Sequence, residues 1–167
     1  MVQKLTALLS TEQCGALLSA VQENASAFRD SVGVWRRMGV NAPDALSNYQ
    51  LLKYWQFPES LKQVFEAQVP EALRATSNEA WLLHFPTGGL FDCYKAPKPL
   101  FQCLSIPLNS GGTFKIWDDG EPVSHTNQAG EGYLFSLATE HEVPVTTQDD
   151  WYLCFLFLHH IEVNNNA

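Results

Sequence analysis

The sequence predicts a mainly β protein of the α+β class, with a two-sheet jelly-roll barrel over residues 80–160 and N-terminal supporting helices. Three observations lead to this prediction. Short runs rich in aromatic and aliphatic residues recur through the second half of the chain. Clusters of Gly, Asp, Asn and Pro separate these runs, as turns do. Helical periodicity is confined to residues 11–24 and 58–74.

Length and composition predict a single soluble domain. The 167 residues, 46% of them hydrophobic, are enough to bury a sizeable core. We divide them into a support region (1–79), the barrel (80–160) and a tail (161–167). Four scattered cysteines without a CxxC pair predict buried free thiols, and the N-terminal stretch has no cleavable signal pattern. We therefore expect a cytoplasmic protein.

Charge and hydropathy exclude two classes of partner. The formal net charge is −8, and no run of Lys or Arg offsets it. Nucleic acid and anionic membrane surfaces are therefore not expected as partners. No apolar run reaches the roughly 20 residues that span a bilayer.

The first half of the chain supplies the helices. Ser10 and Gln13 form a capping-box pattern, which predicts that the first helix begins at residue 11. Residues 47–57 read as extended chain with two tyrosines. Pro58 opens the second helical stretch, and Pro70 either kinks it or starts another helix.

The second half supplies the strands, with turn residues between them. From Gly111 onward the pattern predicts a strand, a long loop, an aromatic strand, a His-bearing turn and a final strand. The predicted strands are residues 80–85, 101–108, 113–117, 133–135 and 151–158.

Four motifs follow one another in this half of the chain: Gly111-Gly112, Ala129-Gly130-Glu131, Tyr133-Leu134-Phe135 and His141-Glu142-Val143-Pro144-Val145. This order resembles the C-terminal half of the double-stranded β-helix of iron- and 2-oxoglutarate-dependent oxygenases, in the prolyl-4-hydroxylase-like branch. The resemblance covers roughly residues 81–160. It implies a barrel whose active site would lie between the two sheets.

The resemblance also assigns the chemistry of that site, and here the sequence departs from the family. Its second metal-binding His falls on His141, but counting from Phe85 and Gly88 puts the His-x-Asp ligands on Tyr94 and Ala96. The basic anchor for 2-oxoglutarate falls on Trp151, or on Tyr152 if the turn differs by one residue, and no Lys or Arg follows Lys115. We therefore expect neither a metal nor a cofactor. The alternative is Fe(II) with 2-oxoglutarate, held by His141 and Asp92 as atypical ligands.

The replacements predict an aromatic pocket with a few polar groups. We expect His141 and Tyr94 to be its acid/base residues, approaching each other from facing strands. The other pocket residues expected from strand alternation and the resemblance are Phe85, Asp92, Phe101, Cys103, Trp117 and Trp151. For each aromatic residue and for Cys103, plain core filling is the alternative interpretation.

Three functions follow as hypotheses. In the first, the chain has the oxygenase fold without its usual iron and 2-oxoglutarate ligands, and binds or transforms a small apolar or aromatic molecule or a peptide side chain. The second is an atypical iron-dependent oxygenase that uses His141. The third is a non-catalytic interaction domain.

Overall fold

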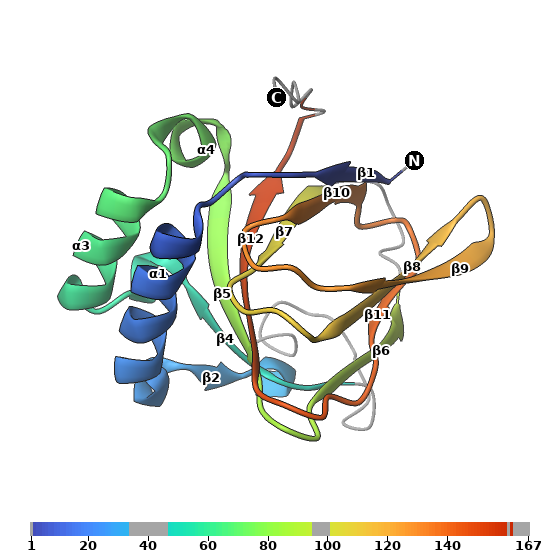
Figure 1. Ribbon diagram of the computed structural model, residues 1–167, viewed down its shortest axis with the longest axis horizontal. Coiled ribbons are helices and arrows are strands. Elements are labelled where there is room, and N and C mark those ends of the chain that lie inside the picture. The colour runs from blue at the N-terminus through green and yellow to red at the C-terminus, as the bar shows by residue number, and fades with distance from the viewer. Residues whose placement is uncertain (1, 34–46, 95–100, 160, 162–167) are drawn as a thin grey trace.

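Two antiparallel sheets face each other in the computed structural model, which describes residues 2–33, 47–94, 101–159 and 161. One sheet has seven strands in the order β1-β10-β7-β12-β5-β4-β2, and the other has five in the order β3-β6-β11-β8-β9. The mainly β jelly-roll prediction is therefore confirmed. Helices α1, α3 and α4 lie together on one side of the molecule, over the outer face of the seven-stranded sheet (Figure 1).

The helices follow the sequence signals closely. Helix α1 spans Thr11–Glu23, and both hydrogen bonds of the predicted Ser10–Gln13 capping box are formed. The second helical stretch is two helices, α3 (Glu59–Gln68) and α4 (Glu71–Thr76), because Pro70 ends one and caps the other. Short 3₁₀ turns occupy Ala25–Ala27 and Tyr54–Gln56.

The seven-stranded sheet consists of β1 (Gln3–Leu5), β2 (Arg29–Asp30), β4 (Gln50–Lys53), β5 (Glu79–Phe85), β7 (Gln102–Pro107), β10 (Gly132–Ser136) and β12 (Asp150–Phe157). Its outermost strands β1 and β2 are largely exposed, whereas its central strands β7 and β12 are buried on both faces. The central strand β12 pairs with β5 on one side and β7 on the other, and all eight of its residues are buried. Its outer face packs on the helices, and its inner face packs toward the second sheet.

The five-stranded sheet closes the other side of the barrel. Its strands are β3 (Ser47–Asn48), β6 (Leu90–Tyr94), β8 (Thr113–Asp118), β9 (Glu121–Thr126) and β11 (His141–Val143). The stretch predicted as a His-bearing turn is thus the short strand β11, which pairs with both β6 and β8. This pairing places His141 on the barrel wall.

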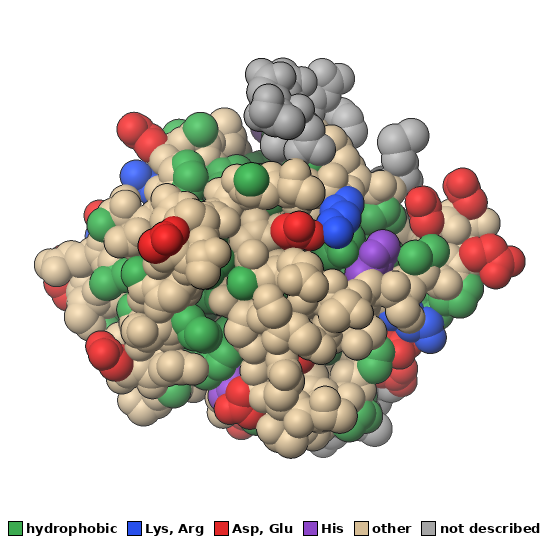
Figure 2. All heavy atoms as spheres, in the orientation of Figure 1, with side chains coloured by type: hydrophobic (Ala, Val, Ile, Leu, Met, Phe, Trp, Pro, Cys, Tyr) green, Lys and Arg blue, Asp and Glu red, His purple; other side chains and the backbone are tan. Residues whose placement is uncertain are grey.

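The long loop predicted after residue 117 is wrong, because this stretch contains β9. Asp119 and Gly120 both have positive φ, of 52° and 84°, and join β8 to β9 as a two-residue hairpin. Positive φ at both central residues defines the hairpin turn that an Asp-Gly pair favours. The hairpin projects from the barrel in Figure 1, and acidic side chains gather over it in Figure 2.

The hydrophobic core has two parts, separated by the seven-stranded sheet. The outer part lies between that sheet and the helices and includes Leu17, Phe65, Leu104 and Phe155. The inner part lies between the two sheets and is richer in aromatic side chains. Among the described helices, none is long and apolar enough to cross a membrane.

Candidate functional site

A cavity of about 120 Å³ lies in the inner core, between the two sheets. Its walls are mostly aromatic, and they come from strands of both sheets. The aromatic residues that line it, His141 aside, are Tyr49, Trp81, Phe85, Phe91, Phe114, Phe135 and Tyr152. The few polar side chains of the wall are His141, Ser105, Cys103, Cys154 and the two tyrosines. A largely apolar cavity with a few converging polar groups is the usual form of a small-molecule site.

His141 is the ionisable base in the described wall of this cavity, and it is buried, with 8% of its surface exposed. Its ring lies 5.3 Å from that of Phe91 and 5.2 Å from that of Phe135, measured between centroids. Nδ1 lies 2.8 Å from the carbonyl oxygen of Thr139, which can only accept a hydrogen bond. The neutral ring therefore carries its proton on Nδ1 and a lone pair on Nε2.

Burial keeps His141 neutral. Loss of solvation lowers the pKa of its imidazole, although the hydrogen bond to the Thr139 carbonyl acts in the opposite direction. Neutral imidazole is the form that accepts a proton or a hydrogen bond at Nε2. His141 is therefore chemically suited to be a base or a polar contact for a bound molecule.

Tyr94 lies beside His141 rather than across the barrel from it. The two residues are paired in the register of β6 and β11, so they belong to neighbouring strands of one sheet. The expectation that they come from facing strands is therefore corrected. The side chain of Tyr94 and the position of Ala96 lie outside the described residues.

The other predicted pocket residues divide into two groups. Phe85 and Cys103 line the cavity. Phe101 packs at the margin of the inner core without being part of the lining. Asp92, Trp117 and Trp151 lie outside the cavity, because each belongs to the outward face of its strand.

Asp92 and Trp117 lie on the outer faces of their strands. In β6 the inward residue is Phe91, so the adjacent Asp92 is exposed. In β8 the inward residues are Phe114 and Ile116. Trp117 therefore faces outward, where the ammonium of Lys115 lies 4.9 Å from its ring centroid.

Trp151 lies on the outer face of β12, under the helices. Its ring stacks on that of His84 at a centroid distance of 3.7 Å and meets Phe28 edge to face at 5.5 Å. The next residue, Tyr152, is the one that enters the cavity. The sequence left two residues open for the anchor position, Trp151 and Tyr152. The structure places the second of them, Tyr152, in the cavity wall.

Tyr152 is buried and remains neutral. Asn127 Nδ2 donates a hydrogen bond of 2.7 Å to its hydroxyl oxygen, and both residues are buried. Burial raises the pKa of the phenol far above its ordinary value, and the nearby Asp150 raises it further. The inward position nearest the expected 2-oxoglutarate anchor thus offers a hydroxyl and an amide but no cation.

The described wall does not fit the iron and 2-oxoglutarate that the resemblance implies. It contains His141 but no carboxylate, because Asp92 is exposed on the other face of β6. No cluster of three or more His, Cys, Asp or Glu suited to a metal occurs in the described part of the chain. The described lining also contains no Lys or Arg to pair with a ligand carboxylate.

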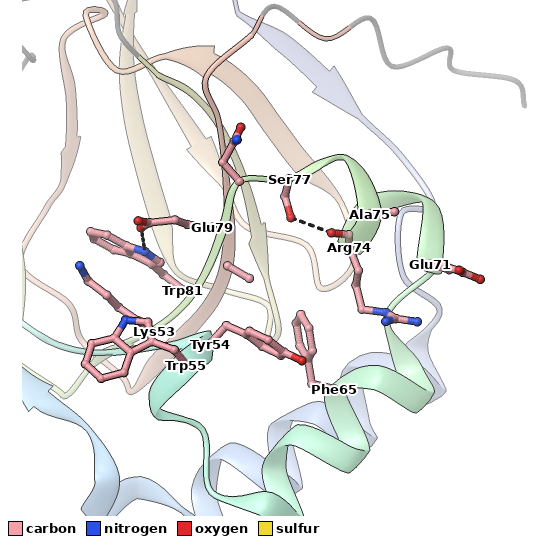
Figure 3. A pocket seen from close by; sticks show the side chains of 12 residues that line it. Lys53, Tyr54, Trp55, Phe65, Glu71, Arg74, Ala75, Ser77, Glu79 and Trp81 are labelled. Carbon is pink, nitrogen blue, oxygen red and sulfur yellow. Dashed lines mark hydrogen bonds between the residues drawn. The ribbon is translucent and has the colours of Figure 1, made fainter.

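A larger hollow of about 550 Å³ lies outside the barrel, between α3, α4 and the start of β5 (Figure 3). Several of its polar groups are already paired. Tyr54 donates to Glu66, Trp81 Nε1 donates to Glu79, and Ser77 donates to the carbonyl of Arg74. Trp81 lines both this hollow and the barrel cavity, so its ring forms part of the partition between them.

We expect the protein to lose stability as pH falls, because three of its histidines have a lowered pKa. Burial lowers the pKa of His84, His125 and His141, so the unfolded chain binds protons more readily than the folded one. The histidine contribution is complete above the unfolded pKa of about 6.5 and is lost below it, by up to about 1.4 kcal/mol per pH unit for each proton. Urea unfolding at about pH 7.5 and 5.5 measures this loss.

Replacement of His141 by Phe separates the contribution of His141 to this loss of stability from the contributions of the other titrating residues. Asp150, whose pKa is raised chiefly by burial, acts with the opposite sign, but it is present in both proteins and cancels in the comparison. The H141F protein should lose less stability between the two pH values than the original chain. An equal loss in the two proteins would mean that folding does not lower the pKa of His141.

Comparison with known proteins adds evidence on the fold. No protein-family model matches the sequence, and no curated protein matches it. A prolyl-4-hydroxylase from Pseudomonas putida superposes with a TM-score of 0.69 at 14% identity, over 95% of this chain and 92% of that one. A prolyl hydroxylase from Trichoplax adhaerens gives 0.71 at 10% identity, over 94% and 83%.

A viral collagen prolyl hydroxylase from Paramecium Bursaria Chlorella virus-1 gives a TM-score of 0.58 at 11% identity, over 93% of this chain and 94% of that one. At such identities the likeness establishes the fold and leaves the activity open. It extends over nearly the whole chain and includes the N-terminal helices. The chain therefore has the fold of the prolyl hydroxylases and other 2-oxoglutarate–iron(II) oxygenases.

Proposed function

We propose that this protein uses the oxygenase barrel to bind a small apolar or aromatic molecule, without the usual iron and 2-oxoglutarate ligands. The observation that carries the proposal is the cavity between the sheets, whose described wall is almost entirely apolar. Binding there is driven by removal of apolar surface from water. The bound group would be either a free molecule or the side chain of a peptide.

The size of the cavity limits the bound group to about one ring. An apolar protein cavity of about 150 Å³ lined by Leu, Ile and Phe binds benzene. The cavity here is slightly smaller, at about 120 Å³, and its aromatic walls favour edge-to-face and offset contacts with a ring. A single five- or six-membered ring is therefore the expected occupant.

His141 supplies the polar contact in this proposal. Its Nδ1 proton is held by the Thr139 carbonyl, so Nε2 is the basic nitrogen of the ring. A ring that carries a hydroxyl could donate a hydrogen bond or a proton to Nε2. If the protein is an enzyme, we expect His141 to be the base of the reaction.

Titration with toluene, followed by ligand NMR, tests the proposal. We expect saturable binding that is unchanged by EDTA, because no metal takes part. Val143→Phe puts a ring into the cavity wall and should weaken toluene binding at least tenfold. The matched control is Leu134→Phe, which enlarges a buried side chain on the outer side of the other sheet and should leave binding unchanged.

Thermal unfolding of both variants shows whether they remain folded. Equal weakening by the two substitutions, or no saturable binding to the original chain, would contradict the proposal. The same titration with phenol tests the polar contact. Phenol should bind more tightly than toluene by roughly tenfold, the value of about one hydrogen bond, and His141→Phe should abolish that preference.

A further inference from the structure

Two cysteine thiols meet in the wall of the barrel cavity, and the proposed function does not use them. Cys103 lies on β7 and Cys154 on the neighbouring strand β12, and only 5% and 6% of their surfaces are exposed. Both side chains line the cavity. Cys154 Sγ also lies 3.6 Å from the hydroxyl oxygen of Ser105, which lines the same cavity.

The strand register sets the spacing of these thiols. Cys154 is opposite Ser105, and Cys103 is opposite Leu156, so the two cysteines are diagonal neighbours. Diagonal Cβ atoms in an antiparallel sheet are about 7–8 Å apart or somewhat less. A disulfide needs Cβ atoms only about 3.5–4.5 Å apart. The diagonal spacing therefore suits an atom that bridges the sulfurs better than a direct bond between them.

We propose that Cys103 and Cys154 form a two-sulfur site for one soft cation of the Cu(I) class. Thiolate sulfur selects soft ions, and Cu(I) accepts two such ligands. Two metal–sulfur bonds, each of roughly 2.3 Å as for a thiolate on zinc, bridge sulfur atoms that are too far apart for a direct bond. Zinc is disfavoured because it takes four ligands, and the described residues offer no cluster of three.

Binding replaces two S–H bonds with two metal–sulfur bonds. Both protons pass to water, no electron is transferred, and the copper remains Cu(I). The Ser105 hydroxyl can donate to the Cys154 sulfur and so stabilise the negative charge that develops there. Because protons are displaced, the apparent affinity should rise with pH, by up to about tenfold per unit for each proton released.

Anaerobic competition against the chromophoric Cu(I) chelator bicinchoninate tests the site. The purified, reduced protein should withdraw one equivalent of Cu(I) from the chelator. Cys103→Ser and Cys154→Ser should each weaken binding at least a hundredfold, since each removes one of two ligands. Cys14→Ser is the matched control, because Cys14 is a buried thiol in the outer core, away from the cavity.

Cys93→Ser tests the remaining thiol, whose side chain lies outside the described residues. Withdrawal of Cu(I) that survives in Cys103→Ser or Cys154→Ser, or that is lost in Cys14→Ser or Cys93→Ser, would overturn the assignment. If a serine variant unfolds, the alanine variant of the same cysteine replaces it. Toluene binding is a separate readout, so its failure would contradict the proposed function and leave the copper site standing.

Discussion

Gly130→Ala should destabilise the protein by more than about 3 kcal/mol, enough to unfold a marginally stable domain. Gly130 has a φ of +82°, where a residue with a Cβ pays roughly 1–2 kcal/mol. An added Cβ would also clash with the carbonyl oxygen of Leu9. That oxygen belongs to the backbone just before α1 and cannot move away as a flexible side chain would.

The hydrogen bonds of Gly130 explain why the backbone of Leu9 lies so close to it. Its carbonyl oxygen accepts hydrogen bonds from the amides of Leu8 and Leu9, at 3.1 and 3.3 Å. Its own amide donates to the carbonyl of Pro107 at 3.0 Å. The turn before β10 therefore ties the start of α1 to the end of β7. A side chain at this position would push these segments apart.

Gly88→Ala is the matched control for Gly130→Ala. Gly88 has nearly the same φ, +85°, but no atom lies within 4 Å of its added Cβ. The free energy of unfolding of this variant should fall only by the cost of a positive φ in a residue with a Cβ, roughly 1–2 kcal/mol. Urea unfolding of both proteins gives the difference between them, which measures the steric part. Equal losses would show that the turn does not pack against the segment before α1.

The fold could be predicted from the sequence because its local signals agree with one another. The Ser10–Gln13 cap, Pro58 and Pro70 mark where the helices begin and end. The hairpin at Asp119-Gly120 carried an equally local signal, which the predicted long loop overlooked. It was obscured because every residue of β9 except His125 is exposed, so the strand has no apolar face to reveal it.

The candidate site was harder to predict, because the central strands of the seven-stranded sheet are buried on both faces. In β12 both the outward Trp151 and the inward Tyr152 are buried, so hydrophobic alternation does not say which one enters the cavity. The error of one residue at the expected anchor follows from this. The same ambiguity hid Cys154, which lies on the inward face together with Tyr152.

In strand β8, unlike β12, the sequence does indicate which residues point inward. Its outer face is partly exposed, and Thr113 and Lys115 alternate with the buried Phe114 and Ile116. Continuing that alternation by one residue places Trp117 outside, so its position could have been predicted. The inward residues Phe91, Phe114 and Phe135 were missed for another reason: a family motif identifies the ligand positions and says little about the walls between them.

The chemistry of the described wall fits neither iron nor 2-oxoglutarate. The distal carboxylate of 2-oxoglutarate would face the neutral Tyr152 and Asn127, with no cation in the described lining. An unpaired buried carboxylate costs several kcal/mol. His141 is the one member of the expected iron ligand set found in that lining.

Titration of 2-oxoglutarate in the presence of Fe(II), under anaerobic conditions, tests this claim most directly. Isothermal calorimetry should show no saturable binding in the micromolar range, while a prolyl hydroxylase of the same fold gives a normal isotherm as the positive control. Toluene should bind to the same sample with or without Fe(II). Tight binding of 2-oxoglutarate that requires Fe(II) and is lost in His141→Ala would contradict the account and identify the protein as an iron-dependent oxygenase with atypical ligands.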